Sequence, residues 1–190
     1  MILPIRAFGD SVLRKHTHEI DKDYPELQTL IDNMFETMHG ANGIGLAAPQ
    51  IGLDIRLFVI DVTPLAEDED YEDIADDLKV FKKVFINAKI LEESGEEWKF
   101  NEGCLSIPDV REDVKRKANI KIEYYDENFV KHVDDFSDIR ARVIQHEYDH
   151  IEGILFTDHL SNLKKKIVKG KLQKIANGDV HVNYKMRFPK

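Results

Sequence analysis

The sequence is organised around the stretch Gln145-His146-Glu147-Tyr148-Asp149-His150. On a helix, residues four apart lie on one face with Cβ atoms roughly 5–6 Å apart, so His146 and His150 can share one metal ion. Glu147 is rotated by about 100° from His146 and therefore stands beside such an ion. The pattern is that of His-Glu-x-x-His metal hydrolases, whose glutamate is the general base for a metal-bound water. The same pattern also occurs on solvated faces of ordinary helices, so the rest of the chain must decide.

A catalytic site of this kind has three protein ligands and one open position, so a third ligand is needed. The position six residues after the second histidine is Phe156, and no glutamate follows Glu152. Four downstream candidates have no spacing that supports them, namely Asp158, His159, Asp179 and His181. The upstream candidate is Cys104, because a thiolate is a strong ligand for a divalent ion. The alternative for a lone cysteine is a small, buried apolar residue.

Length and composition indicate a soluble globular protein. The chain has 190 residues, with 42% hydrophobic and 33% charged residues, which suits a single catalytic domain spanning residues 1–190. We find no apolar run of about 20 residues and no signal peptide, so we expect no membrane partner. With one cysteine, an intrachain disulfide is impossible, which favours a reducing, cytoplasmic setting.

The net charge of −9 is unevenly distributed along the chain. Residues 66–77 contain eight acidic side chains in twelve positions, and we expect a solvated surface excursion there. Residues 161–190 contain nine Lys or Arg and one Asp, which gives +8 for this part and leaves −17 for the rest. Such a basic tail suits either a polyanionic partner or an ordinary solvated helix. We do not expect DNA as a partner.

Periodicity predicts three helices and several strands. The helices are expected at residues 25–39, with Pro25 at the first helical position, at about 137–152, with Ser137 as N-cap, and at about 160–175. Strands are expected at residues 55–62, 80–91, 114–125, 129–133 and 180–188. Without a βαβ rhythm, these elements predict an α+β fold, with short antiparallel and mixed sheets around a central metal-binding helix. An N-terminal helix and a basic C-terminal helix, followed by a strand, complete it.

The glycine-rich stretch at residues 43–52 invites a comparison with nucleotide-binding loops. A phosphate loop needs Lys and Ser or Thr after its glycines, and Leu46 and Ala47 offer neither. A dinucleotide-binding fold needs a strand before the glycines, whereas a helix is predicted there. Close approach of a peptide backbone is the better use of these glycines, with a plain turn as the alternative.

Three motifs together resemble the signatures of the peptide deformylase family. They are Gly43-Ile44-Gly45-Leu46-Ala47-Ala48-Pro49-Gln50, Glu102-Gly103-Cys104-Leu105-Ser106 and the opening stretch at 145–150. Their order and approximate spacing match, and Ile2-Leu3-Pro4-Ile5 and Gly9-Asp10-Ser11-Val12-Leu13-Arg14 are also similar to the family. The resemblance covers about residues 2–160. It implies a metal-dependent hydrolase that removes the formyl group from the N-terminal formyl-methionine of new polypeptides and releases formate.

The resemblance also implies a role for each matched residue. Cys104, His146 and His150 would hold the metal, and Glu147 would move the proton. The side-chain amide of Gln50 and the backbone N–H of Leu105 would stabilise the oxyanion. Ile44 and Gly45 would present backbone groups to an extended substrate. Val143 lies one turn before His146 on the same helix face, so from its position we expect it to wall the methionine slot or simply to belong to the core. Glu102 is expected to make a hydrogen bond that orients the metal ligands or is structural.

The family resembles iron(II) enzymes, so Fe(II) is the expected ion, although the ligand types also allow zinc, nickel or cobalt. Formyl-methionyl nascent peptides are the expected partners. The basic C-terminal helix is expected to contact ribosomal RNA through its lysines, as in some family members. Two alternatives remain: a metallopeptidase with its third ligand after His150, and a non-catalytic metal-binding or ribosome-binding module.

Overall fold

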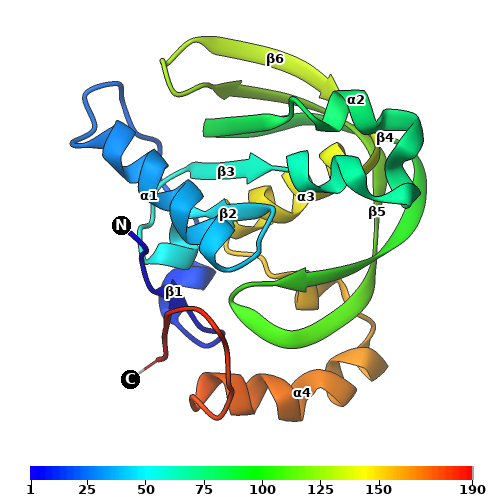
Figure 1. Cartoon of the computed structure of the whole chain (residues 1–190). Helices are drawn as coiled ribbons and strands as arrows, with labels where there is room; N and C mark the ends of the chain where they lie inside the picture. The colour runs from blue at the N-terminus through cyan, green and yellow to red at the C-terminus, as the bar shows by residue number, and fades with distance from the viewer. Residues whose placement is uncertain (190) are drawn as a thin grey trace.

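The computed structural model describes residues 1–189 and contains two sheets (Figure 1). The larger sheet is antiparallel, with its strands in the order β2-β3-β4-β5-β6. These strands are β2 (Gly45–Ala47), β3 (Leu57–Asp61), β4 (Lys82–Cys104), β5 (Ile107–Tyr125) and β6 (Lys131–Phe136). The smaller sheet pairs two short strands in parallel, β1 (Ile5–Arg6) and β7 (Met186–Arg187). Segments from the two ends of the chain therefore lie side by side.

Within residues 1–189, four α-helices accompany the sheets: α1 (Leu27–Gly40), α2 (Ala75–Leu78), α3 (Asp138–Ile151) and α4 (Asn162–Ala176). The α3 helix lies in the middle of the molecule and contacts β2, β3 and β5 (Figure 1). The predicted α+β class is confirmed, with a central helix between an N-terminal and a C-terminal helix. Among the described residues, no helix is both long and apolar enough to cross a membrane.

The core is built where the apolar faces of these elements meet. All five residues of β3 are buried, and Phe58 stacks on Phe85 of β4 with ring centroids 4.7 Å apart. The apolar face of α3, including Ile139 and Ile144, packs into the same cluster. Burying these side chains removes their apolar surface from water, which is the main stabilising contribution to folding. The helix that carries the opening stretch is therefore fixed on a rigid sheet.

The β4 and β5 strands are longer than the short strands predicted from the sequence. They contain 23 and 19 residues and form one long bent hairpin with several register shifts. Such bulges bend a strand and increase its twist without ending it. The bend brings the end of the hairpin, at Cys104, to the helix α3.

Several predicted boundaries are wrong. Pro25 is not the first helical residue, because Glu26 takes a left-handed conformation with φ +54° and α1 begins at Leu27. The N-cap predicted at Ser137 is confirmed, although its hydroxyl donates to Asp138 and makes no capping hydrogen bond. The strand predicted at residues 180–188 shrinks to the two residues of β7. The acidic stretch at residues 66–77 is largely exposed, as predicted, and it is folded into short 3₁₀ turns and α2.

Candidate metal centre and active site

Three side chains converge at the end of the β4–β5 hairpin on α3. Cys104, His146 and His150 place their ligand atoms within 4.8 Å of one another. Cys104 Sγ lies 3.3 Å from Nε2 of His150, and the two imidazole centroids are 5.2 Å apart. The two histidines share one face of α3 because they are one helical turn apart. The structure thus brings together the three residues predicted as metal ligands.

The charge around Cys104 favours its thiolate form. Burial opposes ionisation of the thiol, but the attraction of His150 and the hydrogen bond with His146 outweigh it, so the pKa of Cys104 falls to about 5. A thiolate is the form that binds metal. Nδ1 of His146 is engaged by Glu102 Oε2 at 2.9 Å, so Nε2 is the ring nitrogen that faces the cluster and could bind a metal. A thiolate and two imidazoles held in this way fit a divalent metal ion.

Glu102 connects the centre to a buried network of charges. Its carboxylate accepts hydrogen bonds from Arg116 Nε at 2.7 Å and from Arg142 Nη1 at 3.0 Å. Arg116 also donates to Asp149 at 2.8 Å, and Asp149 in turn pairs with His159. Burial opposes ionisation of Glu102, but His146 and Arg116 outweigh it and hold its pKa well below the usual range. The orienting hydrogen bond predicted for Glu102 is present, and it is made to the first histidine of the motif.

Glu147 lies beside the three ligands without joining them. The side chain is 4% exposed, and its Oε2 atom has no hydrogen-bond partner among residues 1–189. Burial raises its pKa to about 7, against the opposing attraction of His146 and His150. A carboxyl group with a pKa near neutrality can both accept and donate a proton at physiological pH.

Gly45 on β2 explains how the carboxylate of Glu147 fits there. A Cβ atom added at Gly45 would lie only 2.3 Å from Glu147 Oε1. The glycine therefore makes room for the glutamate, in addition to any approach of a substrate backbone predicted from the glycine-rich stretch. Sequence reasoning did not identify this contact, because it joins two segments a hundred residues apart.

Gln50 is buried beside the metal ligands and held in one orientation. Its Oε1 atom accepts from the backbone N–H of Ala47 at 2.8 Å, so its NH₂ group points to the other side. There Nε2 lies 3.5 Å from Cys104 Sγ and 3.3 Å from Ser106 Oγ. Leu105 follows Cys104 directly in the turn between β4 and β5. Both predicted oxyanion donors thus lie next to the ligand cluster.

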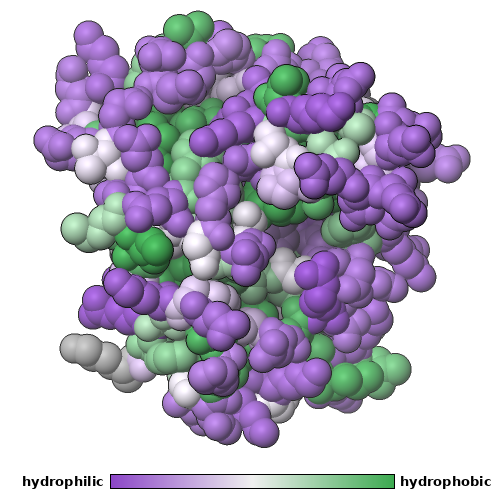
Figure 2. Space-filling model, in the orientation of Figure 1, coloured by the Kyte–Doolittle hydropathy of each residue, from purple (hydrophilic) through white to green (hydrophobic). Residues whose placement is uncertain are grey.

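A groove of about 790 Å³ runs along this cluster. Its lining includes Ile44, Gly45 and Val143, together with Gln50, Glu147 and the ligands Cys104 and His146. In the space-filling view, the middle of this face is hollowed and bordered by hydrophobic side chains (Figure 2). One edge of β2 pairs with β3, and β2 is the last strand on its side of the sheet, so its other edge is free to pair with an extended peptide.

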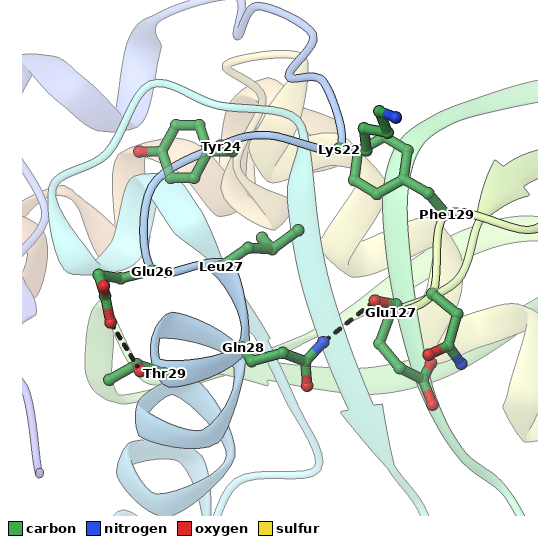
Figure 3. A pocket seen from close by; sticks show the side chains of 9 residues that line it. Lys22, Tyr24, Glu26, Leu27, Gln28, Thr29, Glu127 and Phe129 are labelled. Carbon is green, nitrogen blue, oxygen red and sulfur yellow. Dashed lines mark hydrogen bonds between the residues drawn. The ribbon is translucent and has the colours of Figure 1, made fainter.

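A second, smaller hollow of about 360 Å³ lies at the start of α1 (Figure 3). It is lined by residues of that helix and by the turn between β5 and β6, where Gln28 donates to the carbonyl of Glu127 at 3.0 Å. None of the residues predicted for the site lines it.

The downstream candidates for a third ligand are placed elsewhere. His159 pairs with Asp149, and Asp158 pairs with Arg14. His181 lines the groove but is not in the ligand cluster. The structure therefore favours Cys104 over any ligand that follows His150.

The sequence did not identify Arg116 or Tyr184 as neighbours of the site, and it indicated no role for Asp149 or Arg142. Arg142 is 1% exposed and lies over the ring of Trp98 at 4.3 Å. The signal available was its place one turn before His146 on the same helix. Nothing in the sequence indicated that Trp98 on β4 would be the partner of Arg142.

A thiolate, two imidazoles and a buried proton-accepting glutamate at the base of a groove define a metal-dependent hydrolase. Comparison with known proteins then specifies the family. The family model for polypeptide deformylase matches residues 2–166. A peptide deformylase of Christiangramia forsetii is 60% identical over 190 residues, covering 100% of this chain and 97% of the relative. One from Flavobacterium johnsoniae is 59% identical, with 99% and 96% of the two chains covered.

Solved structures agree with the sequence comparisons. A crystal structure of a peptide deformylase from Legionella pneumophila superposes with a TM-score of 0.79 at 36% identity, covering 94% of this chain and 98% of that one. A Plasmodium falciparum peptide deformylase in complex with an inhibitor gives a TM-score of 0.76 at 32% identity, with 91% and 99% covered. The chain belongs to the peptide deformylase family. It is a metal-dependent enzyme that removes the formyl group from newly made polypeptides.

Proposed function

We propose that this enzyme deformylates N-terminal formyl-methionine with an iron(II) ion held by Cys104, His146 and His150. The observation that carries the proposal is the buried, unpartnered carboxylate of Glu147 beside this ligand cluster. A divalent ion in such a site lowers the pKa of a bound water toward about 7 and polarises a carbonyl oxygen. Thiolate and imidazole donors suit Fe(II), and zinc, nickel and cobalt accept the same donors.

Glu147 is proposed to move the proton of the reaction. It takes the proton from the attacking water and delivers it to the amine nitrogen as the bond to the formyl carbon breaks. Its pKa of about 7 supports both steps at neutral pH. The products are formate and a free N-terminal amine.

Gln50 and Leu105 are proposed to stabilise the negative charge that develops on the formyl oxygen. Both donors are fixed before the substrate arrives, since Gln50 is anchored by Ala47 and Leu105 lies in a two-residue turn. Preorganised donors of this kind typically contribute about 2.7–4 kcal/mol each to lowering the barrier.

The free edge of β2 is proposed to bind the substrate backbone. Ile44 and Gly45 would pair with the extended peptide, and Val143 would form one wall of the slot for the methionine side chain. Val143 is 6% exposed and lines the groove one helical turn before His146, which supports this position.

The first test is formate release from a formyl-methionyl tripeptide by protein purified without oxygen and loaded separately with Fe(II), Ni(II), Co(II) or Zn(II). We expect release in all metal-loaded samples and the highest turnover with iron. Elemental analysis of the protein as purified identifies the bound ion. Absence of formate from every loaded sample would overturn the proposal.

The role of Glu147 is tested by Glu147→Gln. We expect turnover to fall by about 10²–10⁴-fold, because general acid–base catalysis contributes roughly that factor. The metal content should stay unchanged, since Glu147 is not in the ligand cluster. Cys104→Ala should instead lose the metal. A metallopeptidase with a downstream ligand would keep its metal in Cys104→Ala, and a binding module would keep its function in Glu147→Gln.

We further propose that residues 1–190 act as one catalytic domain in the cytoplasm and that α4 contacts the ribosome. Six lysines on α4 could neutralise ribosomal RNA phosphates. They are Lys164, Lys165, Lys166, Lys169, Lys171 and Lys174. Co-sedimentation with ribosomes should weaken steeply with salt, and replacing Lys165, Lys166 and Lys169 with Glu should abolish it without changing tripeptide turnover. Binding that survives these replacements would contradict the proposed contact.

A further inference from the structure

The turn between β4 and β5 is short, and it lies directly beside the ligand cluster. Cys104 pairs with Ile107 across the hairpin, so Leu105 and Ser106 alone form the turn. Cys104, a proposed metal ligand, directly precedes the turn. Leu105, a proposed oxyanion donor, is its first residue. In a two-residue turn, the carbonyl groups of the two central residues lie outside the ladder of the hairpin and need other partners.

Both carbonyls are bound by segments from the two ends of the chain. The backbone N–H of Phe8 donates to Ser106 O at 2.8 Å. The hydroxyl of Tyr184 donates to Leu105 O, also at 2.8 Å. Phe8 lies two residues after β1, and Tyr184 lies two residues before β7. The two donors therefore both lie next to the small β1–β7 sheet, and both bind the same turn.

The β1–β7 pair makes these two contacts depend on each other. Ile5 N–H donates to Lys185 O at 2.8 Å, and Ala7 N–H donates to Arg187 O at 2.9 Å. The chain reaches β7 from α4 through Gly178, which has φ +78°, a conformation that favours glycine. Figure 1 shows this C-terminal segment beside β1 and near the end of the β4–β5 hairpin.

The same segment also forms part of the groove. Residues 181–184 line it together with Cys104, Leu105 and Glu147. The aromatic ring of Tyr184 packs, half-buried, in the apolar cluster that also includes Leu105. The match to the family model ends at residue 166, so it assigns no role to residues 181–184.

We infer that Tyr184 is a positioning residue: with Phe8 it clamps the Leu105–Ser106 turn and fixes the Leu105 N–H where the oxyanion develops. The inference rests on the proposed role of Leu105. Oxyanion donors are effective because they need no reorganisation during the reaction. A turn whose carbonyl loses its partner can rotate toward water, and its N–H then leaves the productive direction.

Tyr184→Phe tests the clamp by removing one hydroxyl and keeping the packed ring. We expect kcat for a formyl-methionyl tripeptide to fall by about 3–10-fold, the factor that corresponds to one ordinary hydrogen bond. KM should change by less than about twofold, because the donor acts mainly on the developing charge. The metal content should remain that of the wild type.

Tyr124→Phe is the matched control. It also removes the hydroxyl of a buried tyrosine, which donates to Asp134 at 2.7 Å on the β5–β6 side of the sheet. We expect this variant to lose stability while kcat stays at the wild-type value. An equal loss of kcat in both variants would overturn the inference, because it would indicate a general effect of weakened folding.

A second measurement addresses the turn without using activity. Backbone order parameters of Leu105 and Ser106, measured by NMR on the metal-free protein, should fall below the value of about 0.85 for a rigid backbone in Tyr184→Phe only. Unchanged order parameters with unchanged kcat would overturn the clamp. A wild-type protein that released no formate would instead overturn the proposed function, while the order parameters would still decide whether the turn is clamped.

Discussion

Glu102 is the residue on which the buried charges of the site converge. It is 3% exposed and binds Arg116, Arg142 and His146 at once. Removing one partner from a buried ion pair leaves an uncompensated charge, so its replacement should affect folding and metal binding together.

Glu102→Gln keeps the size of the side chain and removes its charge. We expect the free energy of unfolding to fall by about 3–5 kcal/mol, because two guanidinium groups lose their buried counter-charge. Metal affinity should fall by about 10–100-fold, since the group that orients His146 is weakened. Denaturant unfolding and a chelator competition measure the two effects.

The control for this variant is Glu123→Gln. Glu123 pairs with Lys131 at 2.9 Å on the surface of the sheet, where an ion pair contributes at most about 1 kcal/mol. Its metal affinity should not change. A similar loss of stability in both variants would show that Glu102 has no special place in the buried network.

Asp61 allows a test of pH dependence away from the metal ligands. It is 6% exposed at the end of β3 and accepts hydrogen bonds from Thr63 and from His39 Nε2. Burial opposes ionisation, but the hydrogen bonds from Thr63 and His39 outweigh it and lower the pKa of Asp61 below its usual range. Its stabilising effect is therefore present above about pH 4 and is lost as the pH falls through the lower, folded-state pKa.

Asp61→Asn should accordingly be less stable than the wild type at pH 7. The difference in free energy of unfolding should shrink as the pH is lowered from 4 to 2, because the wild-type carboxylate becomes protonated. Urea unfolding at several pH values measures this. A difference that stays constant over that range would contradict the expected linkage.

At the scale of elements, β2 places Gly45 where the central helix presents the carboxylate of Glu147, the residue proposed to move the proton. Gly45→Ala would place a methyl group only 2.3 Å from Glu147 Oε1, and the carboxylate would have to move. We expect kcat/KM to fall by about 10²-fold, since a displacement of about 1 Å can cost that factor. Steady-state kinetics with a formyl-methionyl tripeptide measures it.

Gly170→Ala is the corresponding control on α4. A Cβ atom there meets nothing within 4 Å, so the change should stabilise the helix by about 0.5–1 kcal/mol without altering turnover. If Gly45→Ala retained full activity, the close contact with Glu147 would have no catalytic meaning.

The sequence predicted α3 well because its apolar residues repeat with the helical period and its histidines lie one turn apart. The long β4 strand was only partly predicted, because residues 92–101 are mostly polar and the strand is stabilised by pairing with β5. The last strand was predicted too long. Alternation extends over residues 180–188, but only two of these residues pair with β1. The length of such a strand depends on its pairing with another strand, and the local sequence does not encode that pairing.

The site was predicted to the extent that its residues lie within motifs. Cys104 could be singled out because no other ligand had a workable position. The contacts of Arg116 with Glu102 and Asp149, and of Tyr184 with Leu105, join segments far apart in the chain. No local pattern marks such pairs, because the fold alone brings them together.

At the scale of the whole molecule, the ligand cluster joins the end of β4 to α3. Removing the metal should leave the fold intact, because the buried residues of the three apolar clusters include none of these ligands, and only Cys104 packs against one of the clusters. A ligand present at 100 times its Kd stabilises the native state by about 2.7 kcal/mol. For a chain of this size, chelation should therefore lower Tm by about 5–10 °C.

Differential scanning calorimetry with and without chelator measures this change. Cys104→Ser, which lacks the thiolate, should show a much smaller shift. Complete unfolding on chelation would mean that the metal holds the fold together, against this expectation.

The pairing of β1 with β7 also sets the order in which the molecule is completed during its own synthesis. The strand β1 leaves the ribosome early, yet it has no partner until Met186 and Arg187 have emerged. Until then Tyr184 cannot reach Leu105. An enzyme that removes the formyl group from other new chains thus lacks this support for the turn of its own proposed oxyanion donor until residues 184–187 have been made.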